Sequence, residues 1–353
     1  MKDLIKKPEP HPIKELKMEK LSWLWPNRIP LGKISLIVGD PGKGKSLLSL
    51  YIAAQVSTGR PWIDTSTPRT PASVLILTAE DDLSDTVGPR LMAAQADLAK
   101  ICSLSSYTDE IGKRHGLYNL TRDLDVLIQT VKDMPDLKLV IIDPISAYME
   151  GKNENKNAEV REYLTPLADL ARNADIAIIG ITHLNKNQMT QTANYRVLGS
   201  IAFTAAVRAV WLVHQDPENE IGRLFVPSKG NLSKNPTGLS FTIMSTSIPT
   251  FDGGTADAPY CAFSPETIHT SAEELLAPIK FEKRSPKKDA ATEWLQEYLS
   301  DGPKPANEIF NVGLQMGFSK RTLERIKSKL GIQSTKIGGI GGGDGKWEWA
   351  LRA

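Results

Sequence analysis

The sequence predicts an α/β protein with a mainly parallel sheet covered by helices on both faces, followed by a small C-terminal domain. Over roughly the first 245 residues, short continuous apolar runs alternate with stretches that have helical spacing. Such runs are typical of strands buried on both faces, and their alternation with helices is typical of a parallel sheet. Near the end of the chain the pattern changes to three short helical segments and two strand-like pieces, which indicates a separate module.

Length and composition narrow the class of protein. The 353 residues allow a large core plus a smaller module, and the net charge of +2 gives no argument from bulk charge for nucleic-acid binding. The two cysteines lie far apart and form no metal-binding cluster, as expected in a reducing compartment. No apolar run is long enough to cross a membrane, and the basic N-terminus is broken by prolines. We therefore expect a cytoplasmic protein without membrane contact.

The elements of the larger domain follow in order. Residues 1–20 are polar and proline-rich and predict a flexible arm, and residues 21–26 form an apolar segment before the first strand. We expect strands at 33–38, 73–78, 137–142, 176–182, 209–213 and 223–227, the last two as an antiparallel pair. We expect helices at 46–58, 82–104, 123–134 and 160–173.

The end of the chain predicts a linker and a second domain. Periodicity fades over 248–286, which we interpret as a linker between a large domain at 21–247 and a smaller module at 287–353. Helices are expected at 289–300, 306–316 and 319–330, and two strand-like pieces flank a glycine-rich turn at 338–345. Three short helices followed by a hairpin are typical of a winged helix-turn-helix domain.

A phosphate-binding loop lies between the first strand and the first helix. The segment fits G-x-x-x-x-G-K-[ST] at every fixed position. Its glycines let backbone N–H groups turn toward a phosphate at the positive end of the following helix. Lys45 would reach the β- and γ-phosphates, and the Ser46 hydroxyl would bind Mg²⁺, so ATP and Mg²⁺ are the expected ligands. The residues expected to bind nucleotide are Gly39, Asp40, Pro41, Gly42, Lys43, Gly44, Lys45, Ser46 and Leu47.

Acidic residues follow two other predicted strands. Asp143 ends an apolar strand in the Walker B pattern, which predicts a second Mg²⁺ ligand. Glu80 follows the strand at 73–78 and is the candidate general base, while Asp81 and Asp82 are expected to start the next helix. The alternative is that all three acids only cap that helix.

A histidine follows a third predicted strand. His183 comes directly after the run at 176–182, where the carboxyl ends of parallel strands form ligand sites. We interpret it as a sensor of the γ-phosphate, and a structural polar residue is the alternative.

These motifs together resemble a known family. The order WLW, GDPGKGKS, AED, LVIIDP, ITHLNK, GSIAFTAAVRAVW and VPSKGNL is similar to the RecA-like ATPases of the RepA type, which include plasmid replicative helicases and phage ATPases. The resemblance covers roughly residues 21–244. The phosphate loop is shared with all P-loop enzymes, whereas the other motifs in combination are more specific.

The resemblance implies a ring, usually a homo-hexamer, with ATP bound between subunits. Arg208 matches the position of an arginine finger from the neighbouring subunit, and Lys229 matches a second cation from that neighbour. A surface charge at the strand edge is the alternative for Arg208. The polar loop at 184–197, with Lys186 and Arg196, would line the ring channel and contact single-stranded DNA, or it is an ordinary solvated loop.

The predicted third helix of the C-terminal module is strongly basic. Lys320, Arg321 and Arg325 lie on it, after an N-cap serine, and predict contacts to duplex or forked DNA. A solvated helix in a protein-contact domain is the alternative. Trp347 and Trp349 alternate on a strand, which favours core positions over base-stacking positions.

Two functions remain open from the sequence. The first is an ATP-hydrolysing, ring-forming DNA helicase or translocase that acts in replication of a plasmid, phage or other mobile element. The second is an ATP-controlled DNA-binding regulator or loader without unwinding activity. Strand displacement on a forked duplex would distinguish them.

Overall fold

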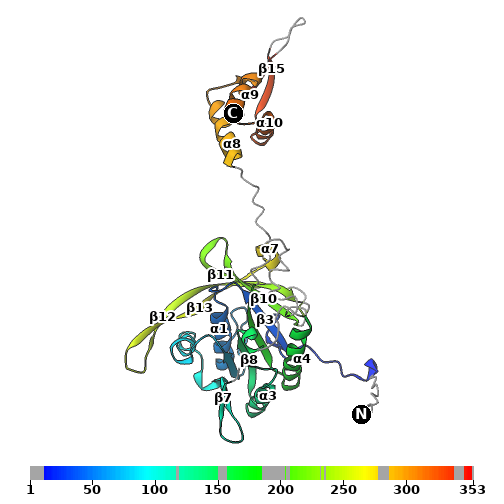
Figure 1. The fold of residues 1–353 in the computed structure, drawn as a ribbon, viewed down its shortest axis with the longest axis vertical. Coiled ribbons are helices and arrows are strands. Elements are labelled where there is room, and N and C mark those ends of the chain that lie inside the picture. Colours follow the sequence, from blue (N-terminus) through cyan, green and yellow to red (C-terminus); the bar gives the residue numbers. More distant parts are fainter. Residues whose placement is uncertain are drawn as a thin grey trace. The chain divides into compact units, whose positions relative to one another are not determined.

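The computed structural model divides the chain into two compact units, Met1–Ala277 and Pro278–Ala353 (Figure 1). The structure describes residues 12–116, 119–149, 157–184, 203, 207–230, 232–233, 236–276, 286–337 and 346–351.

The larger unit is built on a nine-stranded sheet with the order β13-β12-β11-β10-β3-β9-β8-β4-β5. Neighbouring strands from β10 to β5 run parallel, and those from β10 to β13 run antiparallel. The mainly parallel sheet predicted from the sequence is therefore confirmed. The strands are β3 (Lys33–Gly39), β4 (Ser73–Thr78), β5 (Ile101–Ser103), β8 (Leu137–Asp143), β9 (Ala177–His183), β10 (Ala209–Asp216), β11 (Asn219–Gly230), β12 (Gly238–Pro249) and β13 (Thr255–Ile268).

Helices cover both faces of this sheet, as expected. Along β3, Ile34, Leu36 and Val38 belong to one buried core and Ile37 belongs to the other, because successive side chains of a strand point to opposite faces. The first core includes residues of α3 (Leu124–Asp133) and α4 (Asn157–Ala174). The second includes residues of α1 (Lys45–Thr58) and α2 (Gly88–Ala93).

The segment before β3 is anchored by buried aromatic rings and one ion pair. Trp25 ends the short strand β1 (Trp23–Trp25), which pairs with β2 (Ile29–Pro30), and its ring stacks on Trp62 at 4.4 Å. The Arg28 guanidinium, which is 3% exposed, forms an ion pair with Asp64, and the Trp25 indole donates to the same carboxylate. Leu24 and Trp25 of the apolar segment predicted at 21–26 are thus part of the core.

The prediction of one long helix at 82–104 is wrong. The chain forms a π-helical turn η2 (Leu83–Val87), the short helix α2, and a 3-10 turn η3 (Leu98–Lys100), and then enters β5. Gln95 has a φ of 59°, a left-handed conformation that an α-helix cannot contain. Ile101 pairs with Val74 at the sheet edge, so an apolar residue that suggested a helix face belongs to a strand.

The prediction of a linker at 248–286 is wrong over most of that range. Strands β12 and β13 pair as a long antiparallel hairpin, and α7 (Ala272–Leu276) follows within the larger unit. Phe241 and Cys261 from this hairpin are buried in the core shared with α1 and α2. The prolines and polar residues of β13 hid a strand in which only Ala258 and Cys261 are buried. Residues 277–285 of the expected linker lie outside the described residues.

The smaller unit follows the predicted order with one addition. Helices α8 (Pro286–Tyr298), α9 (Ala306–Gln315) and α10 (Lys320–Lys329) agree with expectation, and Ser319 caps α10 by accepting from the Thr322 N–H at 3.2 Å. Strands β15 (Gln333–Ile337) and β16 (Lys346–Ala350) pair antiparallel. The short strand β14 (Lys304–Pro305), which was not predicted, pairs with the other edge of β16.

The two tryptophans of β16 differ in their environments. Trp349 is 3% exposed and packs edge-on against Phe310 at 5.1 Å, whereas Trp347 is 52% exposed. The expectation of a core position is confirmed for Trp349 and wrong for Trp347. The small core therefore includes Trp349 and does not include Trp347.

Two remaining expectations concern the N-terminus and the membrane. Residues 1–11 of the predicted arm lie outside the described residues, and residues 12–20 are exposed and contain one 3-10 turn, η1 (Ile13–Glu15). In the described part of the chain, no helix is both long and apolar enough to span a bilayer.

Candidate nucleotide site

The loop between β3 and α1 has the backbone that its glycines predict. Gly42 and Gly44 have φ values of 71° and 95°, which glycine adopts without a steric penalty. A Cβ on Gly44 would lie 3.2 Å from the Ile243 Cδ1 atom. A Cβ on Gly39 would lie only 2.3 Å from the Val213 carbonyl oxygen, so this position requires glycine. The loop therefore turns tightly, and at Gly39 and Gly44 a larger residue would crowd its neighbours.

Lys45 is held at the floor of this loop. Its side chain is 4% exposed, and its ammonium donates to the Asp40 carbonyl oxygen at 2.9 Å and lies 3.2 Å from the His183 Nδ1 atom. Burial lowers the pKa of Lys45, and the charges of Asp143, Asp40 and Glu80 oppose that shift. The ammonium is thus held in place beside the loop, where it can donate to the oxygens of a bound phosphate.

Asp143 and Ser46 form an oxygen pair beside Lys45. The Ser46 hydroxyl donates to the Asp143 carboxylate, and burial together with the charges of Asp81 and Glu80 raises the pKa of Asp143 to about 6. Hydroxyl and carboxylate oxygens are ligands that suit Mg²⁺. Among the described residues, no group of three or more His, Cys, Asp or Glu could hold a metal by itself. The two oxygens therefore fit a Mg²⁺ ion that takes its other ligands from nucleotide and water.

A cavity of about 400 Å³ opens over the loop and brings most of the predicted residues together. Glu80 and His183 line it beside Lys45 and Ser46. Asp82 caps η2 as expected, but Asp81 does not: it faces the cavity and pairs with Arg90 at 2.7 Å. The complete lining is Pro41, Gly42, Gly44, Lys45, Ser46, Leu47, Glu80, Asp81, Arg90, His183, Ile243 and Pro259.

Three residues of this lining were missed by the sequence analysis. Arg90 was expected in the middle of a long helix, where nothing singled it out, and Ile243 and Pro259 belong to the β12–β13 hairpin. The sequence would have suggested the Arg90–Asp81 pair only if a short helix starting near Asp82 had been predicted there, because such a helix places Arg90 close to Asp81.

The register of the sheet explains why distant motifs meet. Gly39 pairs with His183, and Thr78 pairs with Asp143, so β3, β9, β8 and β4 end at the same edge. In open parallel sheets, ligands bind at this carboxyl edge. The positions of Lys45, Asp143, Glu80 and His183 follow from strand order alone.

Arg208 and Lys229 do not line the cavity over the phosphate loop. Arg208 is exposed and directly precedes β10, whose first residue Ala209 pairs with Ser35 near the start of β3. Gly39 is level with Val213, so Arg208 lies about 17 Å back along the strand direction. The Lys229 ammonium donates to the Val207 carbonyl at 3.1 Å, and burial and the charge of Arg208 lower its pKa. The two cations are thus neighbours, away from the cavity over their own loop.

The predicted DNA contacts are only partly covered by the structure. Lys186 and Arg196 lie outside the described residues, as does the side chain of Arg321. Arg325 is exposed on α10, while the Lys320 ammonium lies 4.7 Å from the centre of the Phe310 ring.

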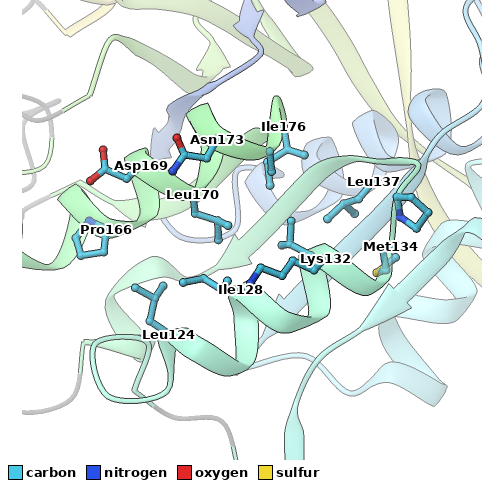
Figure 2. Close-up of a pocket in the computed structure, with 13 residues that line it drawn as sticks. Leu124, Ile128, Lys132, Met134, Leu137, Pro166, Asp169, Leu170, Asn173 and Ile176 are labelled. Atoms are coloured by element: carbon cyan, nitrogen blue, oxygen red, sulfur yellow. The ribbon is translucent and has the colours of Figure 1, made fainter.

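A larger cavity lies away from this chemistry. This groove has a volume of about 570 Å³ and lies between α3 and α4. Apolar side chains such as Leu124, Ile128 and Leu170 make up most of its lining (Figure 2). It includes Leu137, the first residue of β8, and Ile176, which directly precedes β9, so it lies at the sheet edge opposite the phosphate loop. Its charged lining residues, Lys132 and Asp169, form no catalytic set, and we assign the nucleotide to the smaller cavity.

The fold and this site define a P-loop, ATP-binding α/β domain. A family model described as "AAA domain" matches residues 10–189, and the chain belongs to that family. A search of curated proteins found no match. Among solved structures, the chain is similar to a RadB recombinase at 16% identity, with 61% of this chain and 89% of that chain covered and a TM-score of 0.42.

Proposed function

We propose that this protein is a RecA-like, ATP-hydrolysing DNA helicase or translocase of the RepA type, which works as a homo-hexameric ring in the replication of a mobile element. One observation carries the proposal: the phosphate-side residues gather at one edge of the sheet, whereas the Arg208–Lys229 pair lies about 17 Å away. An arginine so far from its own nucleotide is available to the nucleotide of a neighbouring subunit.

In this proposal each residue of the cavity has a distinct task. Lys45 binds the β- and γ-phosphates, Glu80 takes a proton from the attacking water, and His183, in contact with Lys45, senses the γ-phosphate. Ser46 and Asp143 hold Mg²⁺, which neutralises charge on the phosphate oxygens when it is bound. Arg208 and Lys229 of the adjacent subunit stabilise the charge that develops on the leaving phosphate.

The DNA contacts belong to the same proposal. The smaller unit is a winged helix-turn-helix domain, supported by its order of three helices and a three-stranded sheet. Lys320, Arg321 and Arg325 of α10 contact duplex or forked DNA, and Lys186 and Arg196 contact single-stranded DNA in the ring channel.

Mixing of inactive subunits tests the shared site. Lys45→Ala and Arg208→Ala proteins should each lose at least about 100-fold in ATP hydrolysis, because each removes a group that stabilises transition-state charge. Mixed, they should recover part of the activity, since some interfaces then combine an intact loop with an intact arginine. Arg114→Ala, which removes an exposed arginine of β7 (Arg114–Gly116), is the matched control and should keep full activity. Absence of recovery would contradict the shared site.

Strand displacement separates the two candidate functions. The helicase should unwind a forked duplex when ATP is present, and Glu80→Gln should bind ATP without unwinding. ATP hydrolysis that DNA stimulates, with no unwinding at any enzyme concentration, would favour an ATP-controlled loader or regulator instead.

A further inference from the structure

An exposed tryptophan lies on the basic side of the smaller unit. Trp347 is 52% exposed, although indole rings are among the side chains that gain most from burial. Directly across the sheet it faces Lys336, its partner in the β15–β16 register. Proteins that bind unpaired nucleotides combine exposed aromatic rings with nearby cations. The ring stacks on a base, and the cation pairs with the phosphate of that nucleotide.

Strand alternation places Trp347 on the same face as the basic helix. Trp347 and Trp349 are two residues apart on β16, so both rings leave the same face of the small sheet. The Trp349 ring carries the Lys327 ammonium of α10 at 4.8 Å from its centre. Trp347 therefore continues the surface that α10 begins.

The charge of this surface favours a nucleic acid. Residues 319–337 and 346–351 contain seven lysines and arginines and only two acidic residues, Glu324 and Glu348. Glu348 pairs with Thr335 and Pro305, and since it is adjacent to Trp347 on the strand, it belongs to the opposite face. By the same alternation Lys346 also belongs to the opposite face, so the cations that lie beside the tryptophans are Lys336, across from Trp347, and Lys327, over the Trp349 ring.

We propose that Trp347, with Lys336 beside it, is a stacking site for an unpaired base of the DNA that the smaller unit binds. The inference rests on the proposed DNA-binding function and adds the kind of DNA: a strand with splayed bases, as at a fork or a single-stranded end. A continuous duplex offers no free base face to the indole ring.

The affinity of the full-length chain for two DNA probes tests this site. In fluorescence anisotropy, Trp347→Ala should weaken binding of a forked oligonucleotide with unpaired thymidines about 5- to 150-fold, the effect of losing one base–aromatic stack. Binding of a blunt duplex of the same length should change less than about twofold. Trp347→Phe should keep most of the fork affinity, and Trp347→Leu should lose it, because leucine has bulk without an aromatic face. Leu314→Ala is the control, since Leu314 is 69% exposed on α9 and should have no effect.

Probes with abasic sites show whether the lost affinity comes from stacking on bases. Replacing the unpaired thymidines by abasic sites should weaken binding by wild type and leave Trp347→Ala unchanged, so that the two losses are not additive. If wild type binds the fork and Trp347→Ala binds it equally well, the stacking site is wrong while the proposed function stands. If wild type binds neither DNA, the proposed DNA function itself fails. If Trp347→Ala weakens both probes equally, the residue stabilises the unit and does not stack on bases.

Discussion

At the scale of single residues, the nucleotide site contains a buried carboxyl group whose ionisation lowers the stability of the fold. Asp143 is an acid held in a buried position beside two further carboxylates, and its pKa is raised from 3.8 to about 6. The Ser46 hydroxyl and the Lys45 ammonium offset this only in part. Because burial and the neighbouring carboxylates penalise the charged form of Asp143, a divalent cation beside it would stabilise its ionised carboxylate.

The sign of this shift predicts how the metal-free protein responds to pH. Because the folded state binds the Asp143 proton more tightly than the unfolded state, the free energy of unfolding should fall as pH rises from about 4 to about 6. Asp143→Asn removes the buried charge and keeps an acceptor for Ser46. It should raise the free energy of unfolding by about 1–3 kcal/mol at pH 7.5 and by almost nothing at pH 4. Urea unfolding in the presence of a chelator measures both, and a less stable variant at pH 7.5 would contradict the argument.

At the scale of elements, the junction of β3 with α1 depends on close backbone packing against β10. The Val213 carbonyl of β10 approaches Gly39 so closely that only a hydrogen fits, while the position of Gly42 has open space around it. The motif therefore contains glycines for different reasons: Gly39 allows a close approach, and Gly42 allows a left-handed backbone.

Two alanine substitutions separate these reasons. Gly39→Ala should lower the free energy of unfolding by about 1–3 kcal/mol or more, because the neighbouring atom is backbone and cannot move aside. Gly42→Ala should lower it by only about 1–2 kcal/mol, the strain of a left-handed alanine. Denaturant unfolding of the two variants side by side measures the difference. Equal losses would show that the Gly39–Val213 contact relaxes without cost.

At the scale of the whole molecule, the two compact units have separate cores. Every buried residue of the sheet cores precedes residue 278, and the core that contains Leu295, Ile309 and Trp349 belongs wholly to the smaller unit. Among the described residues, the cores of the two units share no member.

This separation predicts that a fragment of residues 1–277 folds alone. It should unfold cooperatively and bind ATP with the affinity of the full chain, since the cavity residues all lie within it. Its affinity for duplex DNA should fall at least about tenfold, because α10 is removed. Circular dichroism, nucleotide titration and anisotropy with the full chain as control measure these properties. Loss of ATP binding by a folded fragment would contradict the independence of the units.

The sequence by itself determined the features that local chemistry specifies. Continuous apolar runs predicted β3, β4, β8 and β9 almost to the residue, and the phosphate loop needed only its glycines, lysine and serine to be recognised. Because parallel strands end at one edge, the sequence order also predicted that Asp143, Glu80 and His183 would follow strands of the sheet that carries the loop.

Tertiary structure alone decided the features that depend on partners distant in the sequence. Thr255–Ile268 is a strand because Gly238–Pro249 pairs with it, and its own composition suggested a linker. Arg90 enters the cavity because the chain turns after Asp82 and pairs the arginine with Asp81. Trp347 and Trp349 have the same local pattern, yet one is exposed and one is buried, because burial depends on what packs against each ring, as Phe310 and Lys327 do against Trp349.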